Sequence, residues 1–183
     1  MEKQILKSWR LIVEMKNKKW ILNENVRQEA RKMAEWLNQW ESQWVALLSG
    51  DVGTGKTTLM NAVIEATTPG KVWHREFSAD FSLSVLKDPE IILRVAEQPL
   101  VAMDDVGREA TEVYFYGNML TPMADFLEYR YREKKKTILT TNLTLKEFEE
   151  KYGERVKSRM KEMVFPVIFL GEDFRRIGPY NSK

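Results

Sequence analysis

The eight residues from Gly50 to Thr57 have the types and the spacing of a loop that binds phosphate groups. They read G-D-V-G-T-G-K-T and fit the pattern G-x-x-x-x-G-K-[ST], in which glycines let the backbone curl so that N–H groups point at phosphate oxygens. We expect Lys56 to reach the β- and γ-phosphates and the Thr57 hydroxyl to be a ligand of Mg²⁺. The residues expected to hold the nucleotide are Gly50, Asp51, Val52, Gly53, Thr54, Gly55, Lys56, Thr57 and Thr58.

The segments on both sides of this loop favour the same interpretation. The apolar run 44–48 precedes it, and 57–64 reads as a helix whose N-terminal dipole adds to an anion site. The alternative is a glycine turn that fits the pattern by chance. The order of strand, loop and helix favours the phosphate loop, because the motif requires that order.

Two adjacent carboxylates follow a second apolar run. Pro99 precedes Leu100-Val101-Ala102-Met103, a run typical of a buried parallel strand, and Asp104 and Asp105 come directly after it. This is the Walker B arrangement. We expect Asp104 to hold Mg²⁺ through water and Asp105 to orient or deprotonate an attacking water. The alternative is an acidic turn that simply ends the strand.

Asn142 and one of two neighbouring arginines are further candidates for catalysis. Asn142 follows Thr140-Thr141 at the end of a predicted strand, and its amide suits a residue that holds water in line with the γ-phosphate. Arg155 and Arg159 lie one helical turn apart, so one of them can be an arginine finger for a neighbouring subunit. Spacing alone also allows an Asx turn at Asn142 and a solvated basic helix face at Arg159. From the residues alone, the candidate catalytic residues are Lys56, Asp105, Asn142 and either Arg155 or Arg159.

Apolar periodicity predicts the elements that position these residues. Predicted helices are an N-terminal one containing 5–13 that ends before Lys16, one that starts at 23–25 and leads into the first strand, and 57–64, 78–86, 89–96, 118–132, 144–151 and 154–162. Predicted strands are 44–48, 71–75, 100–103, 137–141 and 164–170, with a loop at 107–117. Thr144 and Glu147 form a capping box. Pro166 requires that the last strand lies at an edge of the sheet or that the proline is at its start.

Strands and helices therefore alternate along the chain. This alternation predicts an α/β fold with a mostly parallel sheet, right-handed crossovers and helices on both faces. Ligands of such sheets bind at the carboxyl ends of the strands, and the phosphate loop, Asp104 and Asn142 all follow strands. We expect the candidate chemistry to converge on that one edge.

Composition excludes several classes of protein. The 183 residues, 43% hydrophobic and 31% charged, suit one globular domain, and the absence of cysteine removes disulfides, thiolate metal sites and cysteine nucleophiles. We expect His74 at a strand end rather than in catalysis. No apolar run approaches the ~18 residues of a membrane span, and the start lacks a signal-peptide core, so we expect a cytoplasmic protein without a membrane partner.

The formal charge of +2 does not by itself indicate nucleic-acid binding, so any DNA contact must come from a local patch. Tryptophans are concentrated before the phosphate loop, which suggests a hydrophobic N-terminal cap or a partner surface; they are Trp9, Trp20, Trp36, Trp40 and Trp44.

Four segments together resemble the DnaC/IstB-like branch of the AAA+ ATPases, which contains helicase loaders and transposition helper ATPases. They are Gly50–Thr57, Pro99–Glu109, Thr140–Asn142 and Gly153–Met160, within a region of resemblance from about Glu41 to Arg176. The resemblance implies a three-layer P-loop NTPase fold of the AAA+ type, with ATP and Mg²⁺ as cofactors. The domains expected are a helical extension (1–22), the AAA+ domain (23–176) and a tail (177–183), without a separate C-terminal lid.

The resemblance also assigns roles by position. Asn142 matches the sensor 1 residue, Arg159 the arginine finger of box VII, and Arg175 a sensor 2 arginine that contacts the nucleotide. The second acidic residue of the Walker B motif is usually Glu in AAA+ proteins, whereas this sequence has Asp105. Because its side chain is one methylene shorter, we expect slow hydrolysis.

Partners follow from the resemblance as well. It implies a homo-oligomer in the ATP state, single-stranded DNA in a central groove, and a replicative helicase or a transposase. The residues proposed to contact DNA are Arg130, Arg132, Lys134, Lys135 and Lys136, with Tyr114, Phe115 and Tyr116 for stacking. A solvated helix end explains the basic run equally, and core or subunit packing explains the aromatic residues.

Two other functions remain open at this point. One is a nucleotide-gated adaptor with negligible hydrolysis, which Asp105 and the N-terminal tryptophans favour. The other is a P-loop kinase of a small substrate, for which the sequence shows no acceptor pocket.

Overall fold

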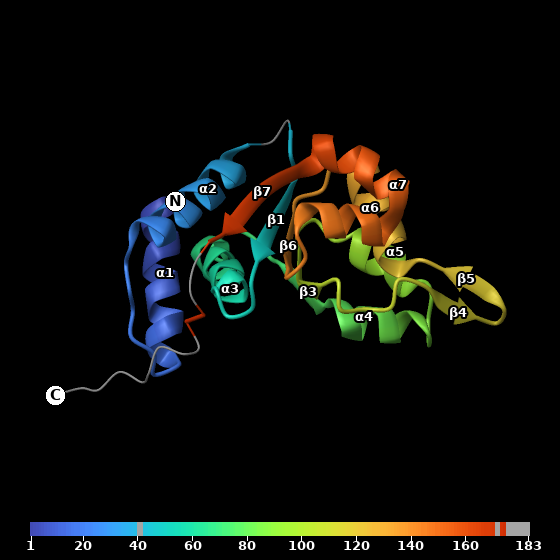
Figure 1. Ribbon diagram of the computed structural model, residues 1–183, viewed down its shortest axis with the longest axis horizontal. Coiled ribbons are helices and arrows are strands. Elements are labelled where there is room, and N and C mark those ends of the chain that lie inside the picture. Colours follow the sequence, from blue (N-terminus) through green and yellow to red (C-terminus); the bar gives the residue numbers. More distant parts are fainter. Residues whose placement is uncertain (40–41, 171–172, 175–183) are drawn as a thin grey trace.

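A five-stranded parallel sheet forms the centre of the computed structural model, which describes residues 1–39, 42–170 and 173–174 (Figure 1). Its strands are β1 (Val45–Gly50), β2 (His74–Phe77), β3 (Val101–Val106), β6 (Thr137–Thr141) and β7 (Val164–Phe169), in the order β2-β3-β6-β1-β7. β1, β3 and β6 are adjacent, so their carboxyl ends meet at one edge, as the sequence predicts. Pro166 lies in β7, an edge strand.

Helices cover both faces of the sheet, which confirms the predicted three-layer α/β fold. One face carries α1 (Glu2–Met15), α2 (Glu24–Asn38) and α3 (Lys56–Thr67). The other face carries α4 (Ser78–Val85), α5 (Ile91–Ala96), α6 (Pro122–Arg132) and α7 (Leu145–Met163). No helix in the described ranges is long and apolar enough to cross a membrane.

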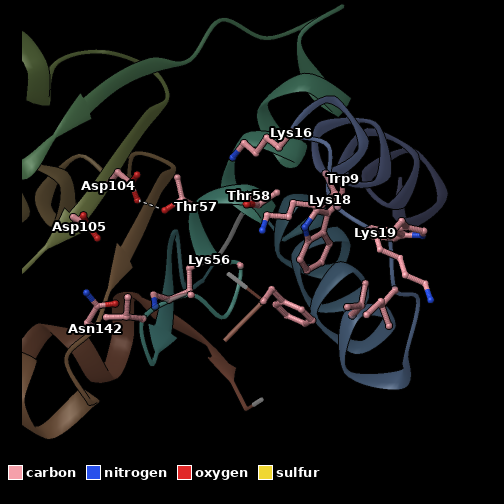
Figure 2. A pocket seen from close by; sticks show the side chains of 18 of the residues that line it. Trp9, Lys16, Lys18, Lys19, Lys56, Thr57, Thr58, Asp104, Asp105 and Asn142 are labelled. Atoms are coloured by element: carbon pink, nitrogen blue, oxygen red, sulfur yellow. Dashed lines mark hydrogen bonds between the residues drawn. The ribbon is translucent and has the colours of Figure 1, made fainter. Parts of the chain in front are cut away.

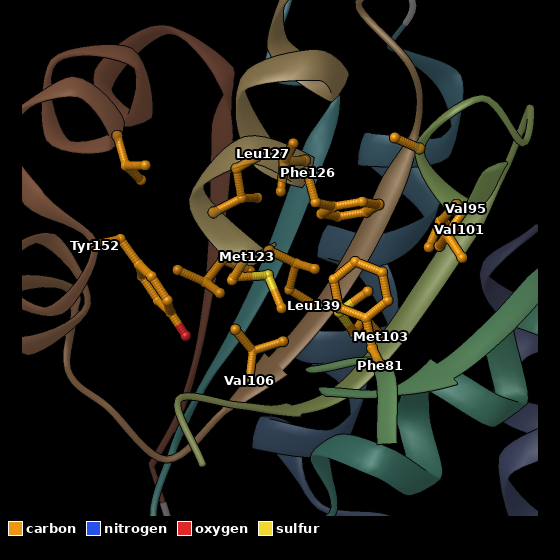
Figure 3. Close-up of a cluster of buried hydrophobic side chains, with 14 of the residues drawn as sticks. Phe81, Val95, Val101, Met103, Val106, Met123, Phe126, Leu127, Leu139 and Tyr152 are labelled. Atoms are coloured by element: carbon orange, nitrogen blue, oxygen red, sulfur yellow. The ribbon is translucent and has the colours of Figure 1, made fainter. Parts of the chain in front are cut away.

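The two apolar cores follow from the twofold side-chain alternation of the strands. In β1, Val45 and Leu47 pack with α4 to α7, whereas Ala46 and Leu48 face α1 to α3. Figure 3 shows the first of these cores, in which Met103 and Leu139 from neighbouring strands meet helical side chains. Because the central strands are buried on both faces, they read as continuous apolar runs in the sequence.

The segment after β3 differs from the prediction. Residues 107–117, predicted as a loop, contain β4 (Val113–Phe115), and the predicted helix from 118 begins only at Pro122, because β5 (Asn118–Leu120) pairs antiparallel with β4. The φ angles of Tyr116 and Gly117, 48° and 83°, reverse the chain between the two strands. Figure 1 shows this hairpin projecting from the body of the protein.

The remaining elements agree with the sequence within a few residues. The second strand was expected at 71–75 and lies at His74–Phe77, while β3 extends to Val106. The capping box at Thr144 and Glu147 is present at the start of α7. The two helices predicted at 144–151 and 154–162 are joined into α7 with a kink at Gly153, whose φ is 82°.

Two of the cations proposed to contact DNA are buried, so that prediction is wrong for them. Arg130 has an exposed fraction of 0% and donates to the carbonyls of Ala96 and Lys136 and to the Thr137 hydroxyl. Lys136 donates to the carbonyl of Trp36. Burial lowers the pKa of Arg130 to about 9 and that of Lys136 to about 8. Both side chains tie strand ends to helices.

Glu29 on α2 gives a stability test, because burial raises the pKa of its carboxyl to about 8, partly offset by the charge of Lys32. The folded state favours the protonated form, so its contribution is complete below pH 4.5 and is lost as the pH rises through 8. We expect Glu29→Gln to raise the free energy of unfolding by about 2–4 kcal/mol at pH 8.5 and to leave it unchanged at pH 4.5. Urea unfolding at both pH values measures this.

The exposed Glu35 lies on the same helix, so Glu35→Gln is the matched control and should have little effect at either pH. An equal gain from Glu29→Gln at both pH values would contradict the buried-acid explanation.

Candidate functional site

The phosphate loop connects the end of β1 to the start of α3. Its backbone requires glycine at Gly53 and Gly55, whose φ angles are 85° and 102°. A Cβ at Gly53 would also lie 1.7 Å from Oδ1 of Asp173. Phe174, the next residue, donates its N–H to the carbonyl of Gly53 at 3.0 Å, so residues 173–174 pack directly on the loop.

Lys56 lies inside the curve of this loop, with an exposed fraction of 6%. Its ammonium donates to the carbonyls of Gly50 and Asp51, each at 2.7 Å. Thr54 braces the turn by donating its hydroxyl to the carbonyl of Asp51 at 2.8 Å. The lysine is therefore held at the concave side of the loop, where phosphate oxygens bind in this motif.

Thr57 and Asp104, the two predicted metal ligands, are in contact. The Thr57 hydroxyl donates to Oδ1 of Asp104 at 2.9 Å, and the Thr140 hydroxyl donates to the same oxygen. Asp104 is 4% exposed, so its charge depends on these donors. A hydroxyl and a carboxylate this close fit one Mg²⁺, which takes few protein ligands and completes its shell with phosphate oxygens and water.

Asp105 has a left-handed backbone, with φ of 56°. Its N–H donates to the Thr140 hydroxyl at 2.9 Å, and its carbonyl accepts from the Ser78 hydroxyl at 2.8 Å, so neighbouring elements hold this conformation. Asp and Asn are the non-glycine residues that adopt it most readily. This backbone gives a physical reason for Asp, where AAA+ proteins usually have Glu.

One cavity of about 700 Å³ brings most of the predicted site together (Figure 2). The predicted residues that line it are Val52, Gly53, Gly55, Lys56, Thr57, Thr58, Asp104, Asp105 and Asn142. They come from the carboxyl ends of three adjacent strands: the phosphate loop and α3 follow β1, Asp104 and Asp105 are among the last residues of β3, and Asn142 follows β6. Gly50, Asp51 and Thr54 complete the loop itself. Arg175 lies outside the described residues.

Arg159 does not line this cavity. Its Nη1 lies 3.1 Å from Oε2 of Glu128 on α6, near enough for an ion pair but without hydrogen-bond geometry. Its guanidinium also lies over the ring of Tyr131, 5.1 Å from the centroid. Arg155, one turn earlier on α7, is exposed. The structure thus places both arginines away from this cavity of their own chain.

The far end of the cavity is apolar, and the sequence did not reveal it. Trp9 and Val13 of α1 form it with Trp20, Ile21, Val26 and Phe174. The rings of Trp9 and Trp20 meet edge to face with centroids 5.9 Å apart. The excess of tryptophan before the phosphate loop was the available signal. Helical periodicity explained Trp9 as packing, which is also true because α1 packs on α3.

Basic side chains also reach the cavity from outside the motifs. Lys16, Lys18 and Lys19 come from the segment after α1, and Arg108 follows β3. Figure 2 shows the ends of Lys16 and Lys18 on the side of Thr58, whereas Lys19 extends away.

No protein-family model matches this sequence, and no curated protein matches it significantly. Solved structures do match. A DnaI structure aligns with a TM-score of 0.65 and 18% identity over 86% of this chain and 88% of its own. The structure of the DnaC helicase loader aligns with a TM-score of 0.63 and 21% identity, over 83% of this chain and 94% of its own. The structure of the replication initiator DnaA, bound to AMPPCP and single-stranded DNA, aligns with a TM-score of 0.63 and 22% identity, over 85% of this chain and 50% of its own.

These matches confirm the predicted fold. The chain has an AAA+ ATPase fold like that of the DnaI and DnaC helicase loaders and of the AAA+ region of DnaA. At these identities the likeness concerns the fold alone. The AMPPCP and the single-stranded DNA belong to the DnaA structure.

The contact of Thr57 with Asp104 generates a test of the metal site. Thr57→Val removes the hydroxyl and keeps the shape, so we expect affinity for ATP with Mg²⁺ to fall ~10-fold or more, and affinity in EDTA to stay the same. Titration calorimetry under both conditions measures this. Thr68→Val, at the other end of α3, is the control. An equal loss with and without Mg²⁺ would show that Thr57 has no part in metal binding.

Proposed function

We propose that the protein is a Mg²⁺-dependent AAA+ ATPase that hydrolyses ATP between subunits of a homo-oligomer. The observation that carries the proposal is the single cavity in which the phosphate loop, the Thr57–Asp104 contact, Asp105 and Asn142 meet. Each group is one that phosphoryl transfer to water needs, and none supplies an acceptor pocket for a small-molecule kinase.

The residues of the cavity divide the work. Lys56 and the loop N–H groups would bind the β- and γ-phosphates, and Thr57 and Asp104 would hold Mg²⁺, which would supply positive charge beside the phosphate oxygens. Asp105 accepts a proton from the attacking water or orients it. Asn142, exposed at the end of β6, holds that water through its amide.

The apolar end of the cavity suits the base of the nucleotide. Phosphates at Lys56 place the base beyond the loop, and there Trp9, Trp20 and Phe174 offer aromatic surface. That DnaA, with a similar fold, binds AMPPCP supports an adenine nucleotide. α1 would then belong to the nucleotide site as well as to the N-terminal extension.

The location of the arginines supports a site shared between subunits. Arg159 does not line the cavity of its own chain, as expected of an arginine that serves a neighbour. Its present contacts, with Glu128 and Tyr131 of α6, would have to be exchanged for the neighbour's nucleotide. The oligomer would bring the α7 of one subunit to the cavity of the next.

Single-stranded DNA is the proposed nucleic-acid partner. The hairpin of β4 and β5 presents Tyr114 and Tyr116, which are 65% and 91% exposed and are suited to stacking on bases. The DnaA structure of similar fold contains single-stranded DNA. We propose that the protein acts in the cytoplasm, in replication as a helicase loader or in transposition with a transposase.

An adaptor that binds ATP with negligible hydrolysis is the second candidate. Arg108 favours it, because its guanidinium donates to Oδ2 of Asp105 at 3.1 Å and competes with water for that carboxylate. The pair is exposed, however, so breaking it costs under ~1 kcal/mol. The next experiment separates the two functions.

Asp105→Asn keeps a side chain that tolerates the left-handed backbone but cannot take a proton. If Asp105 is the catalytic carboxylate, we expect ATP affinity to stay within about threefold and phosphate release to fall ~100-fold or more. Calorimetry and phosphate release, with and without single-stranded DNA, measure this. Asp80→Asn on α4 is the surface control. Wild-type protein that binds ATP but shows no turnover in either condition would favour the adaptor, and no ATP binding would refute both functions.

Arg159→Ala tests the shared site. We expect normal ATP binding and a ~10³-fold loss of hydrolysis, since an arginine finger contributes at least that much. Addition of Lys56→Ala protein, which has an inactive loop but an intact Arg159, should restore part of the activity. The double variant Lys56→Ala/Arg159→Ala should restore none. Absence of rescue in the first mixture would contradict action between subunits, and loss with Arg155→Ala alone would move the role to Arg155.

A further inference from the structure

Glu109, on the segment that follows β3, is a buried carboxylate that the proposed hydrolysis does not use. Its exposed fraction is 3%. One carboxylate oxygen accepts from the N–H of Gly107 at 2.8 Å, and the other accepts from the Tyr152 hydroxyl on α7. A buried charge is costly unless its oxygens have donors, so these two contacts fix the side chain between the turn and the helix.

On one side, Glu109 holds the turn that carries Asp105. Gly107 has φ of 108°, and a Cβ there would lie 2.7 Å from Cδ1 of Leu143. The Thr141 hydroxyl donates to the carbonyl of Val106 at 2.6 Å and accepts from the N–H of Leu143 at 3.1 Å. The turn at Gly107 is therefore packed against the segment that carries Asn142 and is hydrogen-bonded to Glu109. A shift of the backbone at Asp105 would displace both Glu109 and this segment.

On the other side, Glu109 holds α7 at its kink. Tyr152 is 6% exposed and packs on Phe148, with ring centroids 4.6 Å apart. Burial and the charge of Glu109 raise the pKa of its hydroxyl, which therefore remains a donor. Lys151 donates to the backbone carbonyl of Glu109 at 3.2 Å. Figure 3 shows Tyr152 at the margin of the core.

The kink in α7 is at the residue directly after Tyr152, which is hydrogen-bonded to Glu109. Gly153 has φ of 82° and ψ of 175°, and a Cβ there would meet no atom of the described residues within 4 Å, apart from its chain neighbours and the adjacent helix backbone. The second half of α7, residues 154–163, carries Arg155 and Arg159. It thus begins two residues after the anchored tyrosine, directly after the kink at Gly153.

We propose that Glu109 is a positioning residue that transmits the state of the Asp105 turn to the arginine-bearing half of α7. The contacts form one continuous path from Asp105 through Gly107 and Glu109 to Tyr152 and the joint at Gly153. Nucleotide bound in one subunit thereby sets where that subunit presents Arg159 to its neighbour. The inference rests on the proposed function, in which Arg159 acts between subunits.

Tyr152→Phe is the sharpest variant, because it removes the bond to α7 and keeps the bond between Glu109 and Gly107. In mixtures, the arginine donor carries Asp105→Asn, which we expect to bind ATP without hydrolysing it. Tyr152→Phe is placed once in this donor (Asp105→Asn/Tyr152→Phe with Arg159→Ala) and once in the acceptor (Asp105→Asn with Arg159→Ala/Tyr152→Phe), and each mixture is compared with the same mixture without Tyr152→Phe. We expect the restored hydrolysis to fall at least fivefold in the first mixture and to stay within twofold in the second. Equal losses, or no loss, would overturn the proposal, because a general loss of structure does not distinguish donor from acceptor.

A second measurement does not depend on action between subunits. We expect a non-hydrolysable ATP analogue with Mg²⁺ to change hydrogen exchange in residues 154–163 at least threefold in wild-type protein, and not in Tyr152→Phe or Glu109→Gln. Tyr129→Phe on α6 is the control and should behave as wild type. An unchanged exchange rate in wild type, or the same change in Tyr152→Phe, would overturn the proposal.

The two measurements distinguish failure of the proposed function from failure of the role proposed for Glu109. If Lys56→Ala and Arg159→Ala do not complement each other, the shared site of the proposed function is wrong. Hydrogen exchange then still decides whether Glu109 connects the turn to α7.

Discussion

The structure depends on the carboxylate of Asp104, which is buried at the point where three elements meet. Thr57 from α3 and Thr140 from β6 both donate to one of its oxygens, while its own strand, β3, lies beside β6. A buried charge without donors would cost several kcal/mol, so these hydroxyls stabilise the fold at this point. The contact sets the start of α3, and hence Lys56, at a fixed place relative to Asp105 and Asn142. Groups far apart in the sequence are thereby brought to one cavity.

At the amino ends of the strands, buried cations are held by hydrogen bonds to backbone carbonyls, just as the buried Asp104 carboxylate is held by hydroxyls at the carboxyl ends. Arg130 is fully buried, and its guanidinium is surrounded by carbonyls of the segments before β3 and β6. Lys136 reaches across the sheet to α2 in the same way. The functional edge holds a buried anion between hydroxyls, and the structural edge holds buried cations between carbonyls. Both edges fix strand positions through polar contacts, which are more directional than the apolar cores.

The sequence predicted those features in which a local pattern has one physical meaning. The glycines of the phosphate loop, the apolar run before Asp104 and the capping box at Thr144 each determine their own local structure, and strand alternation then determines the fold. It could not predict features that depend on distant neighbours. Arg130 reads as part of a basic surface run, and only its carbonyl partners show that it is buried. Trp9 reads as helix packing, because the cavity that it lines forms only when α1 meets the loop. The left-handed backbone of Asp105 likewise depends on Ser78 and Thr140.

The tip of the β4–β5 hairpin has a consequence for selection on this chain. Tyr116 has a left-handed backbone, a conformation that a bulky side chain adopts at a cost of order 1 kcal/mol, and asparagine would occupy it more favourably. The rings of Tyr116 and Phe115 are perpendicular, with centroids 4.7 Å apart. Because 91% of Tyr116 is exposed, burial of its side chain offsets little of the backbone strain energy. A chain selected for stability alone would lose this tyrosine. The hairpin tip thus sets stability against the presence of an exposed aromatic ring. A redesign for thermostability would replace Tyr116 without any damage to the fold, and the ring would be lost.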